Sequence, residues 1–571
     1  MEKLYIYNIK NYDDKKLTYD EAMVATCLQG IANQDKILVY IMTEKIWGEK
    51  EQSEINPNER WLAGPKYWLE IMSEKDRWLS KYEKIYLKDI DELFELVRDK
   101  VKGAVIWDED VPASFNVANT MAGVKDLIVF SHDYAYLKLK KWNLSIEKDF
   151  SGMFTGNITG SAKNDAYIWA IENFLEKGLC SSHFIFLYED PFFARKKGDI
   201  GYVVTRDWVM KNRGFVYDLS PWGDEVPADD ESQELGTDLK TYKKMLEVLY
   251  KTHTSDEFTE VCGFFCFSKY SDMPDHKSSH EPVSTEWETV YIISPYNCYQ
   301  NTVASACYNQ SVHSQYKLSS LKQSRPKEKI KINNNKTYIS ILMADYDSTT
   351  PLYAFMPKHW GDKKRGEIPL LWGVNPNLSE TYPDIIEFMY ETRSENDYFA
   401  GDASCAGYFN PTKIPVENLP AFVKHNKYFY EKFDMTLSPM VLDWKEPTSE
   451  IKDSFVQFSP DGFATIVMDL HNTGGTEPED HNWKGMPITT LINDACNFHS
   501  VQETAQILSN RIKANNGRKP GHYFFRIVWT DPKDVIASID LLKKMRPELD
   551  IEIIDAYNFF SLCKELFSEQ S

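Results

Sequence analysis

The stretch that decides the fold of the C-terminal half is Thr337–Pro351, which reads TYISILMADYDSTTP. Its apolar part, Tyr338–Met343, has the length of one strand, and it ends abruptly in Asp345 and Asp347. A short apolar run of this kind is typical of a strand that is buried on both faces of a parallel sheet. We therefore predict a central parallel strand with two carboxylates at its carboxyl end.

The pattern continues on the C-terminal side of this strand, where apolar runs alternate with amphipathic stretches of helical length. Further strands are predicted at Leu370–Gly373, Tyr398–Gly401, Thr436–Leu442, Ala464–Met468, Tyr523–Trp529 and Ile551–Ile554. Helices are predicted at Tyr382–Arg393, Val416–Phe433, Val501–Ala514 and Pro532–Met545. This alternation indicates an α/β fold, and residues 337–571 suit a closed or nearly closed β/α barrel of about seven or eight strands.

The N-terminal half shows the same alternation with less regular spacing. Strands are predicted at Ile37–Met42, Ala104–Trp107 and Leu127–Phe130, with a helix at Tyr19–Asn33. We predict an N-terminal α/β domain over residues 1–140 and a second α/β region over residues 141–330, joined to the barrel by the aperiodic segment 322–336. The acidic segment Trp222–Thr237 is interpreted as a solvated loop.

Composition and charge limit the class of protein. The 571 residues are 42% hydrophobic and 26% charged, and the formal net charge is -21. A field of this sign opposes binding to nucleic acid and to anionic membranes. No apolar stretch approaches the length of a membrane span, so we expect a soluble multidomain protein. The localisation expected is cytoplasmic, or secreted if a leader is missing from this sequence.

Acidic, amide and aromatic side chains recur just after the predicted strands, where β/α folds place functional groups. They are Asp345 and Asp347, Trp372 and Asn375, Asp402, Asp443 and Trp444, Asp469 and His471, Trp529 and Asp531, and Asp555. Helix capping is the alternative role for Asp531 and Asp555, and in part for Asp347, because an Asp before a helix is a preferred N-cap.

Carboxylates beside planar aromatic rings favour carbohydrate chemistry. Two carboxyl groups can act on an acetal as acid and as base or nucleophile, while aromatic faces stack on sugar rings. We predict Asp345, Asp402 and Asp469 as catalytic, with Asp345 as the general acid or the nucleophile. The predicted substrate-binding residues are Asp347, Trp372, Asn375, Tyr408, His471 and Trp529.

The segment Gly401–Pro411, GDASCAGYFNP, resembles the motif that names the GxGYxYP family of glycoside hydrolases. Cys405 stands at the first Gly of the motif and Asn410 at its second Tyr, so two of the five named positions differ. The tracts LTYDEAMVATCLQGIANQDKILVYI, ILMADYD, HWGDKKRGEIPLLWGVNPNL and LDIEIIDAYNFFSLCKEL are also similar to that family. The resemblance implies N-terminal α/β domains before a barrel-like domain, and a role in carbohydrate processing, but it supplies no catalytic pair.

Two other functions remain open on the sequence. A non-catalytic glycan-binding protein would use the same aromatic and acidic side chains. A metal-dependent carbohydrate deacetylase would hold a divalent cation with Asp345, Asp347 and His471. We expect no other cofactor, since signatures of nucleotide, zinc-protease and serine-hydrolase sites are missing from the sequence. The partner expected is a carbohydrate, and the oligomeric state stays open.

Overall fold

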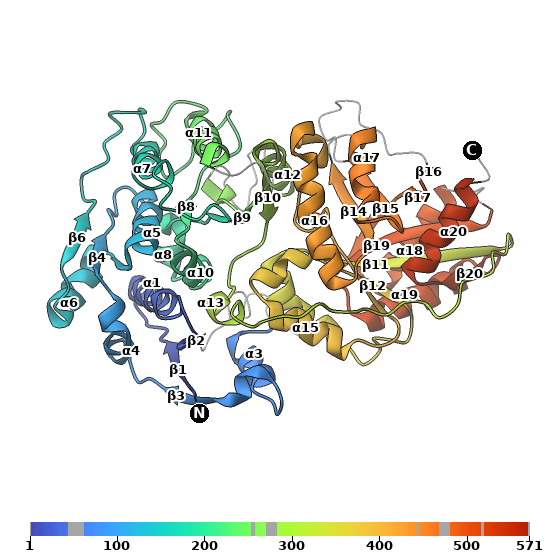
Figure 1. Cartoon of the computed structure of the whole chain (residues 1–571), viewed down its shortest axis with the longest axis horizontal. Coiled ribbons are helices and arrows are strands. Elements are labelled where there is room, and N and C mark those ends of the chain that lie inside the picture. The colour runs from blue at the N-terminus through green and yellow to red at the C-terminus, as the bar shows by residue number, and fades with distance from the viewer. Residues whose placement is uncertain are drawn as a thin grey trace. The chain divides into compact units, whose positions relative to one another are not determined.

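The computed structural model describes residues 2–43, 62–252, 257–269, 282–443, 446–467, 480–514 and 519–568. The chain forms two compact units, Met1–Lys317 and Leu318–Ser571. Both are mixed α/β with mostly parallel sheets (Figure 1). Among the described residues, no helix has both the length and the hydropathy that crossing a bilayer requires.

The described residues of the first unit form three parallel sheets. Their orders are β2-β1-β3, β5-β4-β6 and β10-β9-β7-β8. The strands are β1 (Glu2–Ile9), β2 (Val39–Thr43), β3 (Tyr82–Tyr86), β4 (Gly103–Ile106), β5 (Leu127–Phe130), β6 (Ile146–Asp149), β7 (Phe184–Leu187), β8 (Phe215–Tyr217), β9 (Thr259–Gly263) and β10 (Cys298–Asn301). The helices are α1 (Lys15–Ala32), α3 (Pro65–Met72), α4 (Ile90–Val97), α5 (Ala113–Lys125), α6 (His132–Trp142), α7 (Ala162–Ala170), α8 (Pro191–Lys197), α9 (Gly201–Val204), α10 (Arg206–Asn212), α11 (Thr237–Thr252), α12 (Pro282–Ile293) and α13 (Gln310–His313).

Helix α1 is the central helix of this unit, and it is buried almost all round from Thr18 to Ala32. Gly30 permits close contact with α10, because a Cβ at this position would lie 2.4 Å from Met210 Cβ. The prediction of a helix at Tyr19–Asn33 is therefore confirmed, with four more residues at its start.

A buried ionic network lies at the carboxyl ends of β7, β8 and β9. The ammonium group of Lys269 is 2.7 Å from carboxylate oxygens of Asp190 and Asp218, and 3.0 Å from one of Asp229. Lys163 joins Asp229 to Asp238. Asp229 belongs to the acidic segment predicted as a solvated loop, yet its side chain is only 1% exposed. That prediction is wrong for Asp229, because two lysines distant in sequence neutralise it.

Two sheets are formed by the part of the second unit that the structure describes. The larger has the order β13-β12-β11-β19-β18, with β20 paired to the start of β11, and the smaller has the order β14-β15-β17-β16. The strands are β11 (Lys336–Tyr346), β12 (Leu370–Val374), β13 (Asp397–Ala400), β14 (Leu437–Asp443), β15 (Gly462–Val467), β16 (His481–Trp483), β17 (Met486–Thr490), β18 (Ile492–Cys496), β19 (Gly521–Val528) and β20 (Asp550–Ile553). The helices are α14 (Met356–Trp360), α15 (Pro383–Thr392), α16 (Leu419–Phe433), α17 (Ser449–Val456), α18 (Val501–Ala514), α19 (Pro532–Met545) and α20 (Ala556–Ser568).

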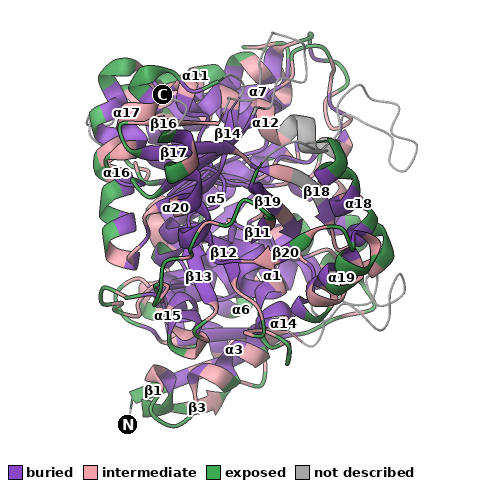
Figure 2. Cartoon of the chain, turned by 90° about the vertical axis from the view of Figure 1, so that its right-hand side faces the viewer, coloured by how far each residue is buried: buried purple, intermediate pink, exposed green. Residues whose placement is uncertain are grey.

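Strand β11 is the central strand of the larger sheet, as predicted from its apolar run. It pairs in parallel with β12, β19 and β20, and residues 337–344 are all buried. Figure 2 shows β11, β12, β13 and β19 as buried strands, with exposed faces on α15, α18 and α19. The seven predicted strands and four predicted helices of this unit are confirmed within a few residues, while β16, β17 and β18 were missed.

The predicted closed or nearly closed barrel is not confirmed. Within the described residues no hydrogen-bonded ladder joins β13 to β14, so the strands form two sheets. The hydroxyl of Ser404 bridges this gap by accepting the Leu442 N–H at 3.0 Å and donating to the Phe409 carbonyl at 2.9 Å. At the far edge of the smaller sheet, β16 runs antiparallel to β17. The predicted alternation of strands and helices is present without barrel closure.

The capping interpretation of Asp555 leads to a first prediction. Asp555 accepts hydrogen bonds from the backbone N–H of Asn558 at 2.9 Å and from its amide side chain at 2.8 Å, at the start of α20. Asp555→Ala should therefore lower the free energy of opening of α20 by about 1 kcal/mol. Hydrogen exchange of α20 checks this, with the exposed Asp540→Ala as the control. Equal exchange in both variants would contradict the capping role.

Candidate active site

The carboxyl end of β11 contains a β-bulge. Met343 pairs with Trp372 of β12 and Tyr346 pairs with Val374, so three steps along β11 match two along β12. The extra residue falls at Ala344–Asp345, and Asp345 has a left-handed backbone with φ of 69°. This conformation costs a residue with a side chain about 1 kcal/mol or more. Bulges of this kind redirect side chains at the ends of strands.

Three side chains from two other segments hold Asp345 in this conformation. Its backbone N–H donates to Asp402 Oδ2 at 2.7 Å, and its carbonyl accepts the Trp529 indole N–H at 2.7 Å. Its carboxylate forms an ion pair with Arg526 of β19. The Asp345 and Arg526 side chains are 24% and 16% exposed, so the pair is open to a ligand.

Asp347 is the second partly exposed carboxyl at this strand end. Burial, followed by the charge of Asp345, raises its pKa to about 7, although the Ser348 hydroxyl and Arg526 act against this shift. Asp347 therefore carries its proton at pH values below about 7. Catalysis by an acid and a base requires one carboxyl group that carries a proton near a second carboxyl group in a different environment. Asp347 and Asp345, which is paired with Arg526, have such different environments.

Asp402 is completely buried behind these two residues. Burial, and then the charges of Asp347 and Asp345, raise the pKa of its carboxyl well above the usual range. Its backbone N–H donates to the Asn375 side-chain oxygen at 2.7 Å, and the Asn375 amide donates to the Ala403 carbonyl at 2.8 Å. Asp402 is thus a buried carboxyl whose protonated form is favoured by its surroundings, and it contacts the site through the backbone of Asp345.

The structure places three predicted substrate-binding residues away from solvent. Trp372 is fully buried, its indole N–H donates to Asp397 at 2.8 Å, and its ring packs on Tyr346 and Trp360. Asn375 is also fully buried, and Tyr408 is 3% exposed. A buried ring face cannot stack on a sugar, so we do not include Trp372 or Tyr408 in the proposed sugar-binding surface.

Trp529 is the one predicted substrate-binding aromatic that is partly exposed. Besides its hydrogen bond to Asp345, it packs edge-on against Phe355, with ring centroids 4.8 Å apart. It lies one residue beyond β19, on the same strand segment as Arg526. The ring is therefore beside the Asp345–Arg526 pair and accessible to a ligand.

The remaining predicted residues have different positions. Asp469, His471 and Trp444 lie outside the described residues. Asp443 is buried and accepts the hydroxyl and backbone N–H of Thr412. Asp531 precedes α19, but its side chain makes no capping hydrogen bond. It lies instead 3.4 Å from Lys358 and 3.7 Å from His359, so the capping interpretation of its side chain is wrong.

The segment that resembles the family motif is buried between β13 and α16. The Ala406 backbone N–H donates to Asn426, and its carbonyl accepts a hydrogen bond from His425. Gly407 has φ of 115°, which glycine adopts without strain. Cys405 is fully buried. These contacts with α16 hold the loop that follows β13, and Asp402 is part of that loop.

Sequence reasoning missed Arg526, the cation of this site. The available signal was its position, because it is the one charged residue in the apolar run Tyr523–Trp529, YFFRIVW. A charge within a buried strand needs a partner, and here the partner is Asp345. Within the described part of the chain, no three His, Cys, Asp or Glu side chains are arranged to hold a metal ion.

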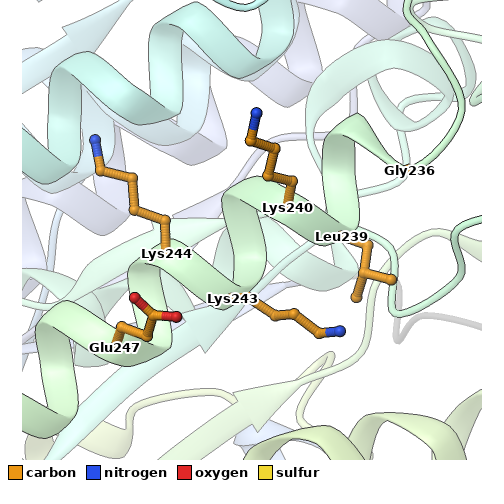
Figure 3. A pocket seen from close by; sticks show the side chains of 6 residues that line it. All are labelled: Gly236, Leu239, Lys240, Lys243, Lys244 and Glu247. Carbon is orange, nitrogen blue, oxygen red and sulfur yellow. The ribbon is translucent and has the colours of Figure 1, made fainter.

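A pocket in the first unit has a different character. It encloses about 470 Å³ beside α11 and is lined by Gly236, Leu239, Lys240, Lys243, Lys244 and Glu247 (Figure 3). Figure 3 shows the lysine side chains extending from successive turns of the helix. With a single carboxylate it offers no acid and base pair, so the strand end of β11 is the stronger catalytic candidate.

Comparisons with known proteins agree with this architecture. The fold is that of a multidomain α/β protein with mostly parallel sheets. Residues 335–564 match the family model described as "GxGYxYP putative glycoside hydrolase C-terminal domain", and residues 101–179 match the second domain of the GxGYxYP N-terminal region. The chain belongs to the GxGYxYP family, as the resemblance of its sequence implied.

One solved structure has a similar fold over nearly the whole chain. A protein from Bacteroides thetaiotaomicron described as a putative hydrolase is 16% identical, with a TM-score of 0.70 over 99% of this chain and 95% of its own. A protein from Mycobacterium smegmatis described as a putative polysaccharide deacetylase is 12% identical and covers 43% of this chain and 96% of its own, with a TM-score of 0.28. No curated protein matches the sequence.

Proposed function

We propose that this protein hydrolyses a glycosidic bond, with Asp345 and Asp347 as the reacting carboxyl groups. The observation that carries the proposal is the contrast between them at one strand end: Asp345 is paired with Arg526, whereas the pKa of Asp347 is raised to about 7. Hydrolysis of an acetal needs one protonated and one ionised carboxyl. Membership of the GxGYxYP family supports the same chemistry.

Each group has a distinct role in this proposal. Asp347 is the general acid that protonates the departing oxygen, because it retains its proton near neutral pH. Asp345 is the carboxylate that attacks the anomeric carbon or activates water. Asp402, which we predicted as catalytic, is too deeply buried to contact a sugar and becomes a supporting residue. Asp469 and His471 stay predicted contributors from the segment after β15.

Trp529 is the proposed sugar-stacking residue. Its partly exposed ring adjoins Asp345, and the polar edge of the indole is already engaged by the Asp345 carbonyl. This leaves the apolar face to cover a sugar ring, which is the usual contact between tryptophan and carbohydrate. We expect an oligosaccharide or polysaccharide as the substrate.

The proposal is tested by product analysis on the full chain. Panels of nitrophenyl glycosides and of polysaccharides should yield at least one substrate that releases a new reducing end. On that substrate Asp345→Asn should lower kcat by a factor of about 10³ or more, because the variant loses the charged carboxylate but retains its shape. The control is Asp540→Asn, an exposed acid on α19.

Three outcomes would contradict the proposal. Full activity of Asp345→Asn would exclude the assigned role. Glycan binding without release of a reducing end would favour the glycan-binding alternative. Release of acetate from an acetylated sugar, abolished by a chelator, would favour the metal-dependent deacetylase.

A further inference from the structure

The Asp345 bulge breaks the regular pairing of β11 with β12, and the residues around it compensate for this. The backbone N–H of Asp345 has a carboxyl oxygen of Asp402, Oδ2, as its acceptor at 2.7 Å. The Asp345 carbonyl has the Trp529 indole as its donor. Both backbone polar groups of the reacting residue are therefore bonded by side chains.

Strand β12 provides the space that Asp402 occupies. A Cβ added to Gly373 would lie 2.5 Å from Asp402 Oδ2 and 2.6 Å from its Cγ. Atoms this close cannot coexist, so only glycine at position 373 lets the carboxyl group lie against the strand. Gly373 does not have a left-handed backbone, so close approach and not chain conformation is the reason for glycine here.

Asn375 secures the same group from the end of β12. Its side-chain oxygen accepts the Asp402 backbone N–H at 2.7 Å, and its amide donates to the next carbonyl, that of Ala403. Asn375 is fully buried, which excludes water as a competing partner. Asn375 therefore holds Asp402 by a hydrogen bond, and Asp402 in turn holds the backbone of Asp345 by another.

We propose that Asp402 is a positioning residue whose carboxyl oxygen replaces the ladder acceptor that Asp345 lost at the bulge, with Gly373 and Asn375 holding that carboxyl in place. The consequence for catalysis rests on the proposed function: the support aims the Asp345 carboxylate at the reacting carbon. A displacement of about 1 Å at a reacting group can lower the rate by about 10²-fold.

Conservative and disruptive substitutions separate positioning from chemistry. Asp402→Asn keeps an oxygen that accepts the Asp345 N–H, so kcat should stay within about threefold of the wild-type value. Asp402→Ala removes the acceptor and should lower kcat by about 10²-fold with KM changed less than threefold. Gly373→Ala should reproduce the Asp402→Ala effect by displacing the carboxyl, with Gly223→Ala of the first unit as the matched control.

A second measurement does not depend on any enzymatic activity. Hydrogen exchange of the Asp345 amide, resolved by fragmentation mass spectrometry, should be at least tenfold faster in Asp402→Ala and Gly373→Ala than in wild type and Asp402→Asn. Unchanged exchange in the first two variants would overturn the positioning role, even in a protein that cleaves no glycoside. Conversely, faster exchange in a protein without glycosidase activity would uphold the support and refute only the proposed function.

The kinetic results have an equally clear contrary outcome. If Asp402→Asn loses as much kcat as Asp402→Ala while its Asp345 amide stays protected, the carboxylic acid itself is required. Asp402 would then take part in proton transfer, and the positioning proposal would be wrong.

Discussion

Asp347→Asn should lower kcat for a sugar substrate by a factor of about 10² to 10⁴, the usual contribution of general acid catalysis. Burial and the charge of Asp345 raise the pKa of Asp347 to about 7, so the wild-type enzyme carries the required proton below this pH. As pH rises through about 7, the acid form is lost and wild-type activity should fall. An asparagine does not titrate, so this alkaline decline should be missing from the variant.

The leaving group provides a sharper form of the same test. A dinitrophenolate departs without protonation, so dinitrophenyl glycosides should lose far less kcat on Asp347→Asn than sugar substrates lose. Asp540→Asn should retain the wild-type rates and pH profile on both. An equal loss on both classes would show that Asp347 does not donate the proton, and would return it to the substrate-binding role predicted from the sequence.

Lys269→Met should destabilise the first unit by about 3 to 5 kcal/mol, because it leaves carboxylates of a buried network without their cation. Lys269 is 0% exposed and lies within 3.0 Å of Asp190, Asp218 and Asp229. Methionine matches the length and volume of the lysine side chain, so the loss would report on charge and not on packing.

The effect of pH identifies the cause of this destabilisation. Burial raises the pKa of Asp190 to about 7 even though Lys269 lowers it. A carboxyl whose pKa is raised by folding stabilises the fold below its unfolded pKa and loses that contribution as pH rises through the folded value. Without Lys269 the pKa of Asp190 is raised further, so the folded protein loses more stability as the pH rises. Lys269→Met should therefore be more destabilised at pH 8 than at pH 5.

Urea unfolding of the full chain, followed by hydrogen exchange within β7, β8 and β9, measures this change. The control is Lys244→Met, since the Lys244 side chain is 40% exposed and lies 3.7 Å from Glu172. An exposed pair of this kind contributes at most about 1 kcal/mol. Similar unfolding of the two variants, or a loss that does not depend on pH, would contradict the proposed charge balance.

The local sequence was sufficient to predict elements whose hydrophobic pattern is typical of one kind of secondary structure. The helices Val501–Ala514 and Pro532–Met545 were predicted with the bounds that the structure has. The apolar run before Asp345 forms the buried strand that its length and composition predicted, and the two carboxyl groups lie at its carboxyl end as predicted. Short strands such as β16 and β18 were missed because three to five residues of mixed polarity have no distinctive period.

The sequence by itself determined the α/β class, the strand that carries Asp345 and Asp347, and the family, because periodicity, strand-end acids and local motifs are properties of neighbouring residues. Tertiary structure decided which charges meet. Arg526 lies 181 positions from Asp345, and Lys269 lies among Asp190 and Asp218, which follow β7 and β8, and Asp229 of the acidic segment Trp222–Thr237. Tertiary structure also separated the acids by role, leaving Asp347 partly exposed and burying Asp402. Burial and pairing across strands set the protonation of a carboxyl, and neither is encoded in its immediate neighbours.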